Sequence, residues 1–262
     1  MRLGKDRDVH RFYVDPGQLR EDRVVIAGEE FRHLQKVLRL GVGDQALLID
    51  GSGHEYEVRL LALDLKAQRA EAEIIAIKAV NREPPIVVTL VQGIVRGDRM
   101  DFIIQKAAEI GVRRIVPLAA EHGVVRVTGE KARRRVERWR KIAREACKQC
   151  GRVVVPEVTE VVDLGQALQM QGDALGIFFY EGEKNRPLKP VLRDNGTLFK
   201  QKGVFIHIGP EGGFSMSEVE TARRCGLFLA GLGPRILRAE TAALAALTTV
   251  LYELGDLGGE EQ

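Results

Sequence analysis

Apolar and polar positions alternate with a period of two over short segments of the first 80 residues. This alternation is typical of half-buried β-strands and predicts strands at 24–26, 46–49, 56–60 and 71–77. Apolar residues at helical spacing predict one helix over 29–38. Short strands separated by turns, such as the Asp-Gly-Ser-Gly turn at 50–53, are typical of small barrels. We therefore interpret residues 1–80 as a small β-barrel domain.

The pattern changes after two adjacent prolines in the segment Asn-Arg-Glu-Pro-Pro. Proline stops both helix and sheet pairing, so residues 81–85 are predicted to be a linker. Beyond them, apolar runs of strand length alternate with segments of helical periodicity. Strands are predicted at 86–91, 115–118, 153–155, 174–180, 204–208 and 227–230, and helices at 99–110, 130–150, 164–170, 215–225 and 239–254. This alternation predicts that residues 86–262 form an α/β domain with a mostly parallel sheet.

Two glycine-bearing loops follow predicted strands near the end of the chain. The first is Gly-Pro-Glu-Gly-Gly at 209–213, and a Ser-x-x-Glu capping box supports the helix start after it. The second is Gly-Leu-Gly-Pro-Arg-Ile-Leu-Arg at 231–238. Parallel strands end at one edge of a sheet, so both loops are expected to offer bare backbone to a small ligand. One such loop is more simply a tight turn, but two of them favour a site.

The commoner uses of glycine loops do not fit these two. The Gly-Lys-Ser/Thr end of a phosphate-binding P-loop is absent, and Ile236 stands where a dinucleotide-binding loop has its third glycine.

Composition is globular, with 45% hydrophobic and 29% charged residues. Three cysteines, no apparent signal peptide and no long apolar run favour a reduced, cytoplasmic setting. Cys147 and Cys150 have no further ligands nearby, so no metal site is predicted.

Basic residues are concentrated in one segment, although the net charge is only +3. Residues 130–152 contain ten Lys or Arg against three Glu. Such a segment is either a nucleic-acid-binding surface or a solvated helix face, and charge alone does not separate the two. Within it, Trp139 is expected to anchor the helix to the core.

Several motifs together give the chain a family resemblance. Ile-Gly-Pro-Glu-Gly-Gly at 208–213 and Leu-Gly-Pro-Arg-Ile-Leu-Arg-Ala-Glu-Thr-Ala at 232–242 resemble the SPOUT-class methyltransferases. More narrowly, they resemble the ribosomal RNA small-subunit methyltransferase E family. Further similarities occur in the family's order, at 10–14, His33, 37–39, 43–44, Asp101, Lys106, 109–112 and 149–152. Three positions depart from the family pattern: Arg96 stands where Lys is common, Ala108 where Thr is usual and Lys148 where Glu is common.

The resemblance implies a fold and an activity. It implies an N-terminal PUA-like β-barrel and a C-terminal α/β domain tied in a deep trefoil knot. It also implies a homodimer that binds S-adenosylmethionine and methylates N3 of one uridine in 16S rRNA of the small ribosomal subunit. Two alternatives stay open: methylation of a ribose 2′-hydroxyl, and a non-catalytic RNA-binding factor in ribosome assembly.

The resemblance also assigns residues to roles. Uracil N3–H must lose its proton, and the anion must be stabilised, before N3 attacks a methyl group. Arg238 is expected to supply the positive charge. Glu240 is the second catalytic candidate: it and Glu211 either take the proton or only hold the loops. The residues expected to bind the cofactor are Tyr180, Glu181, Gly209, Pro210, Glu211, Gly212, Gly213, Leu232, Gly233, Ile236, Leu237, Arg238 and Thr241, and those expected to bind RNA are Arg11, Arg39, Arg96 and Arg152.

Overall fold

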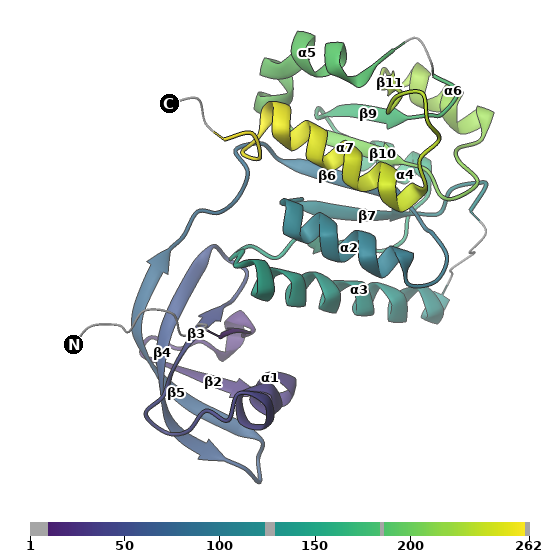
Figure 1. Cartoon of the computed structure of the whole chain (residues 1–262). Helices are drawn as coiled ribbons and strands as arrows, with labels where there is room; N and C mark the ends of the chain where they lie inside the picture. The colour runs from purple at the N-terminus through teal and green to yellow at the C-terminus, as the bar shows by residue number, and fades with distance from the viewer. Residues whose placement is uncertain (1–9, 124–128, 184–185, 260–262) are drawn as a thin grey trace. The chain divides into compact units, whose positions relative to one another are not determined.

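The computed structural model describes residues 10–123, 129–183 and 186–259, and the chain divides into two compact units (Figure 1). Unit 1 comprises Met1–Arg82 and Cys147–Val155, and unit 2 comprises Glu83–Ala146 and Pro156–Gln262. The sequence-based division at 81–85 assigned residues 147–155 to the C-terminal domain. In the structure these residues pack in unit 1, so that unit is built from two separate stretches of chain.

Unit 1 is built around a five-stranded sheet in the order β1-β3-β4-β5-β2. Its strands β1 and β3 are parallel, and the other neighbouring pairs are antiparallel. The four strands predicted in this part are confirmed, and the unpredicted strand β1 is too short to show a period of two. The strands are β1 (Arg11–Tyr13), β2 (Arg23–Ala27), β3 (Gln45–Ile49), β4 (His54–Asp64) and β5 (Arg69–Ala79), with a 3-10 turn η1 (Pro16–Gln18) after β1.

The predicted helix of unit 1 is present in two parts. It begins as α1 (Gly28–Arg32) and continues as a π-helical turn η2 (His33–Val37). Two side chains of this helix, Phe31 and Leu34, are buried in the core of unit 1, where Phe12 and Leu48 also lie. The ring of His33 meets the edge of Phe12 at a centroid distance of 5.7 Å. His33 therefore has a packing role.

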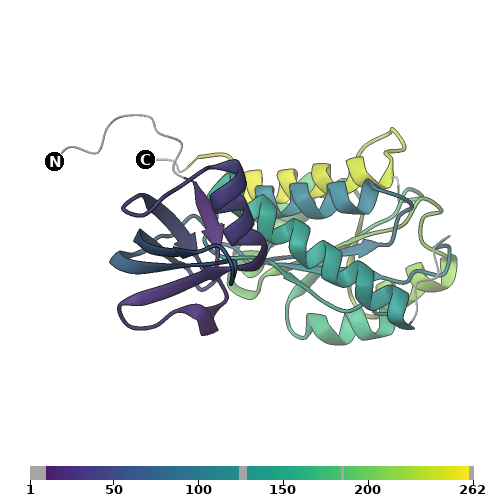
Figure 2. The same cartoon turned by 90° about the horizontal axis from the view of Figure 1, so that it is seen from below.

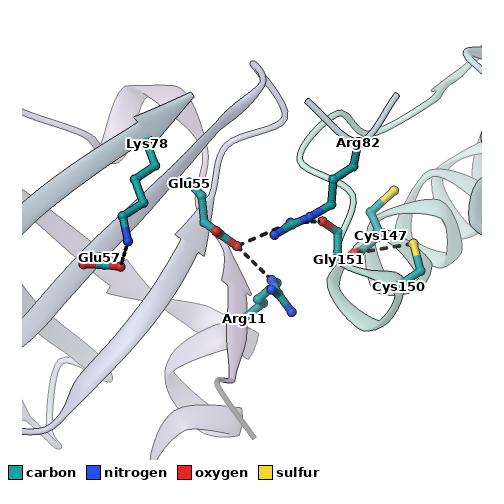
Figure 3. Close-up of polar contacts among 8 residues, drawn as sticks. All are labelled: Arg11, Glu55, Glu57, Lys78, Arg82, Cys147, Cys150 and Gly151. Atoms are coloured by element: carbon teal, nitrogen blue, oxygen red, sulfur yellow. Dashed lines mark hydrogen bonds and ion pairs between the residues drawn. The ribbon is translucent and has the colours of Figure 1, made fainter. Parts of the chain in front are cut away.

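A buried carboxylate of unit 1 connects, through Arg82, to Gly151 at the end of the basic segment 130–152 (Figure 3). Glu55, on β4, is only 6% exposed and accepts a hydrogen bond of 2.9 Å from Nε of Arg11. Nη1 of Arg82 lies 3.7 Å from the same carboxylate and donates to the carbonyl oxygen of Gly151 over 2.5 Å. The backbone N–H of Gly53 also donates to the carbonyl oxygen of Val153. These contacts explain why residues 147–155 belong to unit 1.

Unit 2 contains a six-stranded parallel sheet in the order β11-β9-β10-β6-β7-β8. The parallel α/β architecture predicted from the alternating pattern is therefore confirmed. The strands are β6 (Val88–Gly93), β7 (Arg114–Leu118), β8 (Glu157–Val158), β9 (Leu175–Phe179), β10 (Val204–Ile208) and β11 (Phe228–Ala230). The helices are α2 (Arg99–Ile110), α3 (Gly129–Cys150), α4 (Leu164–Gln171), α5 (Leu188–Lys202), α6 (Met216–Arg224) and α7 (Ala239–Leu254), and the last four residues of α3 belong to unit 1.

Two elements differ from the sequence prediction. The strand expected at 153–155 is absent, because those residues pack on unit 1, and β8 forms after them instead. Helix α5 was not predicted, since Pro190, Asn195 and Gly196 are poor helix formers. Its apolar face compensates, because Leu192 and Phe199 are buried in unit 2. Tertiary packing thus outweighs local propensity here.

The register of the sheet separates two apolar faces. Ile177, Ile206 and Leu90 are side by side in neighbouring strands, and Phe178, His207 and Val91 form the next row. Successive side chains of a strand point to opposite faces, so these two rows serve different helix layers. Helices α2 and α7 cover one face and α4 covers the other (Figure 2). In the described part of the chain, we find no helix with the length and apolar character needed to cross a membrane.

Candidate functional site

A cavity of about 1300 Å³ lies where four parallel strands of unit 2 end. Its walls come from the segments that directly follow β9, β10 and β11, and from the first turn of α2, which follows β6. The connections that leave the adjacent strands β6 and β10 run in opposite directions across the sheet, from β6 to β7 and from β10 past β9 to β11. Ligands of open α/β sheets bind at such a switch point, beyond the carboxyl ends of the strands.

Most residues predicted to bind a cofactor are brought together around this cavity. The lining includes Tyr180, Glu181, Gly209, Pro210, Glu211, Gly213, Leu232, Gly233, Ile236, Leu237 and Arg238. Gly212 and Thr241 are not among the lining residues. A Cβ on Gly212 would lie 3.0 Å from the carbonyl oxygen of His122, so this glycine packs against the turn after β7. Its lack of a side chain therefore serves loop packing rather than the cavity wall.

Glycines bring the loops close to the strand ends. A Cβ on Gly93, the last residue of β6, would lie 2.4 Å from the backbone nitrogen of Pro210. Gly213 has a φ of +67°, a conformation that favours glycine, and its missing Cβ leaves room for the carboxylate of Glu181. A Cβ on Gly231 would lie 2.6 Å from the carbonyl oxygen of Glu183. These close approaches fix the positions of the two loops, and Gly209, Gly213, Gly231 and Gly233 expose backbone in the cavity wall.

Arg99, in the first turn of α2, connects the two glycine loops. Its Nη2 lies 3.1 Å from Oε1 of Glu211 in the first loop, and its Nη1 lies 4.0 Å from Oε2 of Glu240 after the second. The Glu211 carboxylate also accepts a hydrogen bond of 2.8 Å from the backbone N–H of Arg96. Both carboxylates are therefore placed around one guanidinium group. The sequence reasoning missed Arg99, although its position just after β6, at the same sheet edge, was an available signal.

The two candidate catalytic residues differ in their surroundings. Arg238 is the N-cap of α7, its side chain is exposed, and it lines the cavity. Within the described ranges, its side chain has no hydrogen-bond or ion-pair partner. Glu240 lies beside Arg99, and its buried Oε2 has no hydrogen-bond partner in the described structure. Arg238 therefore lines the cavity, whereas Glu240 lies beside Arg99 and is not among the lining residues.

A capping box at the start of α6 fixes the first loop from behind. As predicted, Ser215 is the N-cap, and its Oγ accepts from the backbone N–H of Glu218. The Glu218 carboxylate accepts from the N–H of Ser215 and also, over 3.0 Å, from the N–H of Glu121. Hydrogen bonds from Ser215 and Ser217 lower the pKa of Glu121. The loop before α6 is thus tied to the turn after β7.

A second, shallower hollow of about 550 Å³ adjoins this region. It is lined by Arg96, Gly97, Asp98, Arg99, Phe102 and Glu240. Arg99 belongs to the walls of both the hollow and the large cavity. The hollow therefore lies immediately next to the cavity, on the side of α2.

The four arginines expected to bind RNA have unlike positions. Arg39 and Arg96 are exposed. Arg11 is paired with Glu55, and Arg152 is only 4% exposed and has interactions of its own. Phosphate contacts require an accessible guanidinium, so RNA contact by the exposed Arg39 and Arg96 stays a prediction, whereas Arg11 and Arg152 have structural contacts. As expected, Trp139 is buried, at 3% exposure, on the inner side of α3.

Comparisons with known proteins show which family the chain belongs to. Residues 82–251 match the model of an RNA methyltransferase domain, and residues 26–75 match that of an RNA methyltransferase PUA domain. Over 238 residues the chain is 36% identical to ribosomal RNA small subunit methyltransferase E of Bacillus subtilis, covering 90% of this chain and 92% of that protein.

Two solved structures are similar over nearly the whole chain. One is a ribosomal RNA small subunit methyltransferase E from Neisseria gonorrhoeae bound to S-adenosyl methionine, with 34% identity and a TM-score of 0.80 over 95% of this chain and 99% of that one. The other is a Legionella pneumophila protein in complex with the cofactor SAM, with 31% identity and a TM-score of 0.83 over 96% and 100%. The fold class and the family resemblance are confirmed, and the chain belongs to the ribosomal RNA small subunit methyltransferase E family.

Proposed function

We propose that this protein transfers a methyl group from S-adenosylmethionine to N3 of a uridine in 16S rRNA of the small ribosomal subunit. The observation that carries the proposal is the cavity formed by the two glycine-bearing loops at the carboxyl ends of β6, β9, β10 and β11, in a chain of this family. We propose that this reaction takes place in the cytoplasm. A non-catalytic assembly factor is disfavoured, because RNA binding alone has no use for such a cavity.

The residues around the cavity fit the proposed cofactor. Backbone at Gly209, Gly213 and Gly233 allows a flat adenosine group to approach closely. The carboxylate of Glu181, beside Gly213, is a suitable neighbour for a cationic sulfonium. The cofactor supplies an electrophilic methyl group on that sulfur. The exposed guanidinium of Arg186 in the cavity wall is suited to pair with the carboxylate of the cofactor's methionine part.

The chemistry assigned to the protein concerns the uracil ring. N3 would give its proton to solvent water, and the freed electron pair would bond to the cofactor's methyl carbon while the electrons of the broken carbon–sulfur bond stay on sulfur. The charge that spreads onto O2 and O4 requires a cationic donor, and we assign this role to Arg238. Glu240, whose carboxylate lies beside Arg99, acts as a positioning residue through that guanidinium. Holding N3 in line with the methyl group contributes much of the rate.

Substitution of Arg238 tests this assignment. Arg238→Ala is expected to retain cofactor affinity in calorimetry and to lose methyl transfer to purified small subunits by about 100-fold or more, the scale found for lost transition-state donors. Near-normal turnover would remove Arg238 from the mechanism. Arg224→Ala is the control, because Arg224 is an exposed arginine of α6 that is not among the residues lining the cavity, and it should leave both measurements unchanged.

The target atom requires a separate experiment. Mass spectrometry of nucleosides from small-subunit rRNA, in cells with and without this protein, is expected to show loss of one N3-methyluridine. A missing 2′-O-methylnucleoside instead would support the ribose alternative. Loss of no modified nucleoside would support the assembly factor.

We also propose that the enzyme is a homodimer and that its α/β domain is knotted. We assign the subunit contact to the surface of α7 around Tyr252, a large side chain that is 63% exposed. The segment after β9 pairs with the segment after β11, through a parallel bridge between Pro187 and Gly231, so two cavity loops pass directly beside each other. Light scattering on the purified protein tests the dimer. A mass equal to one chain would contradict it.

A further inference from the structure

We propose that the shallow hollow beside the cofactor cavity is the subsite that receives the target pyrimidine, with the ring of Phe102 stacking on the base. This inference rests on the proposed function, because it assigns the substrate's place relative to that cavity. It goes further by naming a residue that neither the family motifs nor the glycine loops identify.

Position is the first argument. A base that accepts a methyl group must bring its nucleophilic atom to within about 3–3.5 Å of the methyl carbon. The base must therefore bind in a space that opens next to the cofactor cavity. The hollow meets this requirement, since Arg99 is a wall residue of both spaces, and Glu240 follows directly on the cavity residues Arg238 and Ala239.

The chemistry of the walls is the second argument. Phe102 is 43% exposed, although it is a large apolar side chain, and it faces the hollow from α2. Exposed aromatic rings are the usual stacking platforms for unpaired bases. Arg96 and Arg99 add cationic donors that suit the carbonyl oxygens of uracil or a neighbouring phosphate. Gly97, at the tip of the loop, has no side chain to block entry.

The charge of the hollow argues against a subunit contact. Four of its six lining residues are Arg96, Asp98, Arg99 and Glu240, which are charged. The buried centres of subunit interfaces are depleted in charged residues. A polar ring with a hydrogen-bonding edge and an apolar face fits such a mixed surface better. A flipped or unpaired uridine has this character.

The experiment compares Phe102→Leu, Phe102→Tyr and a control. Phe102→Leu keeps an apolar side chain but removes the ring, and it is expected to reduce methyl transfer to small subunits by about 10- to 100-fold, through a higher KM for the subunit. Cofactor affinity and oligomeric state should stay at wild-type values. Phe102→Tyr should retain activity. Leu198→Ala, which trims an apolar side chain of 45% exposure on α5, should not change it.

A crosslink provides a readout that does not depend on activity. Small-subunit rRNA containing 5-bromouridine is irradiated with the wild-type protein, and the adduct is expected on the tryptic peptide of residues 100–106. Wild-type protein that crosslinks there but transfers no methyl group would contradict the proposed function and leave the subsite supported. Full activity of Phe102→Leu, an adduct confined to other peptides, or an altered oligomeric state of Phe102→Leu would each overturn the subsite.

Discussion

Gly93 at the end of β6 lies directly beneath Pro210 of the neighbouring loop, so closely that a Cβ would be 2.4 Å from the proline nitrogen and 2.5 Å from its Cδ. Both atoms belong to backbone or to a rigid ring and cannot move aside cheaply. This contact sets how near the first glycine loop approaches the sheet. It therefore controls the depth of the cavity wall.

Gly93→Ala is expected to displace the loop at Pro210. We expect a loss of cofactor affinity of at least about tenfold and a loss of stability of about 1–3 kcal/mol, the usual cost of overpacking. Calorimetry and urea unfolding measure the two effects. Gly17→Ala is the control, because a Cβ there meets nothing within 4 Å. Unchanged cofactor affinity in Gly93→Ala would show that the close approach of Pro210 to the end of β6 does not affect cofactor binding.

Arg99 and Glu211 are expected to be energetically coupled. Their side chains are partly exposed, so solvent screening limits the coupling to about 0.5–1 kcal/mol. A double-mutant cycle of Arg99→Ala and Glu211→Gln, followed by urea unfolding, measures this quantity. Strictly additive effects would mean that the guanidinium does not hold the first loop.

Lys148 and Glu30 form an ion pair within unit 1, in which the lysine side chain is only 7% exposed. The Nζ atom lies 2.8 and 3.1 Å from the two carboxylate oxygens. Lys148→Glu introduces the residue common in the family and is expected to cost about 3 kcal/mol or more, because two like charges then meet in a buried site. The double variant Lys148→Glu with Glu30→Lys should regain most of this loss in urea unfolding.

An exposed ion pair supplies the control for that experiment. Glu130 and Arg134 in α3 are both about three-quarters exposed, so Glu130→Gln should change stability by less than about 0.5 kcal/mol. A failure of the double variant to recover stability would contradict direct pairing of Lys148 with Glu30. The pairing with Glu30 would then no longer explain why this chain has Lys148 where the family commonly has Glu.

His207 is expected to make the stability of unit 2 depend on pH. Burial lowers the pKa of this histidine from 6.5 to about 3, so below pH 6.5 the unfolded chain binds a proton that the folded chain does not. Stability therefore falls as the pH drops through this window, by about 2 kcal/mol between about pH 7 and about pH 5. Urea unfolding at both values should show a smaller loss for His207→Gln. His54→Gln is the control, since the ring of His54 is exposed. Equal pH dependence in wild type and His207→Gln would refute this role.

Local pattern was sufficient for most elements. The helix predicted at 99–110 has the observed bounds and ends at Gly111, whose φ of +118° suits glycine. The strand at 204–208 and the helix at 239–254 also match, because buried faces impose a clear period on the sequence. The local pattern did not predict helix α5, and the strand it predicted at 153–155 is absent, since the structure of both segments depends on partners elsewhere in the chain.

The sequence by itself determined the α/β order of unit 2, the capped helix start after the first loop, and the two loops that line the cavity. These features depend on neighbouring residues, so composition and spacing reveal them. Only the tertiary structure decided that Arg99 connects Glu211 with Glu240, that Gly212 packs on His122, and that Arg152 is buried. Contacts between distant segments depend on strand order and register, which local patterns do not specify.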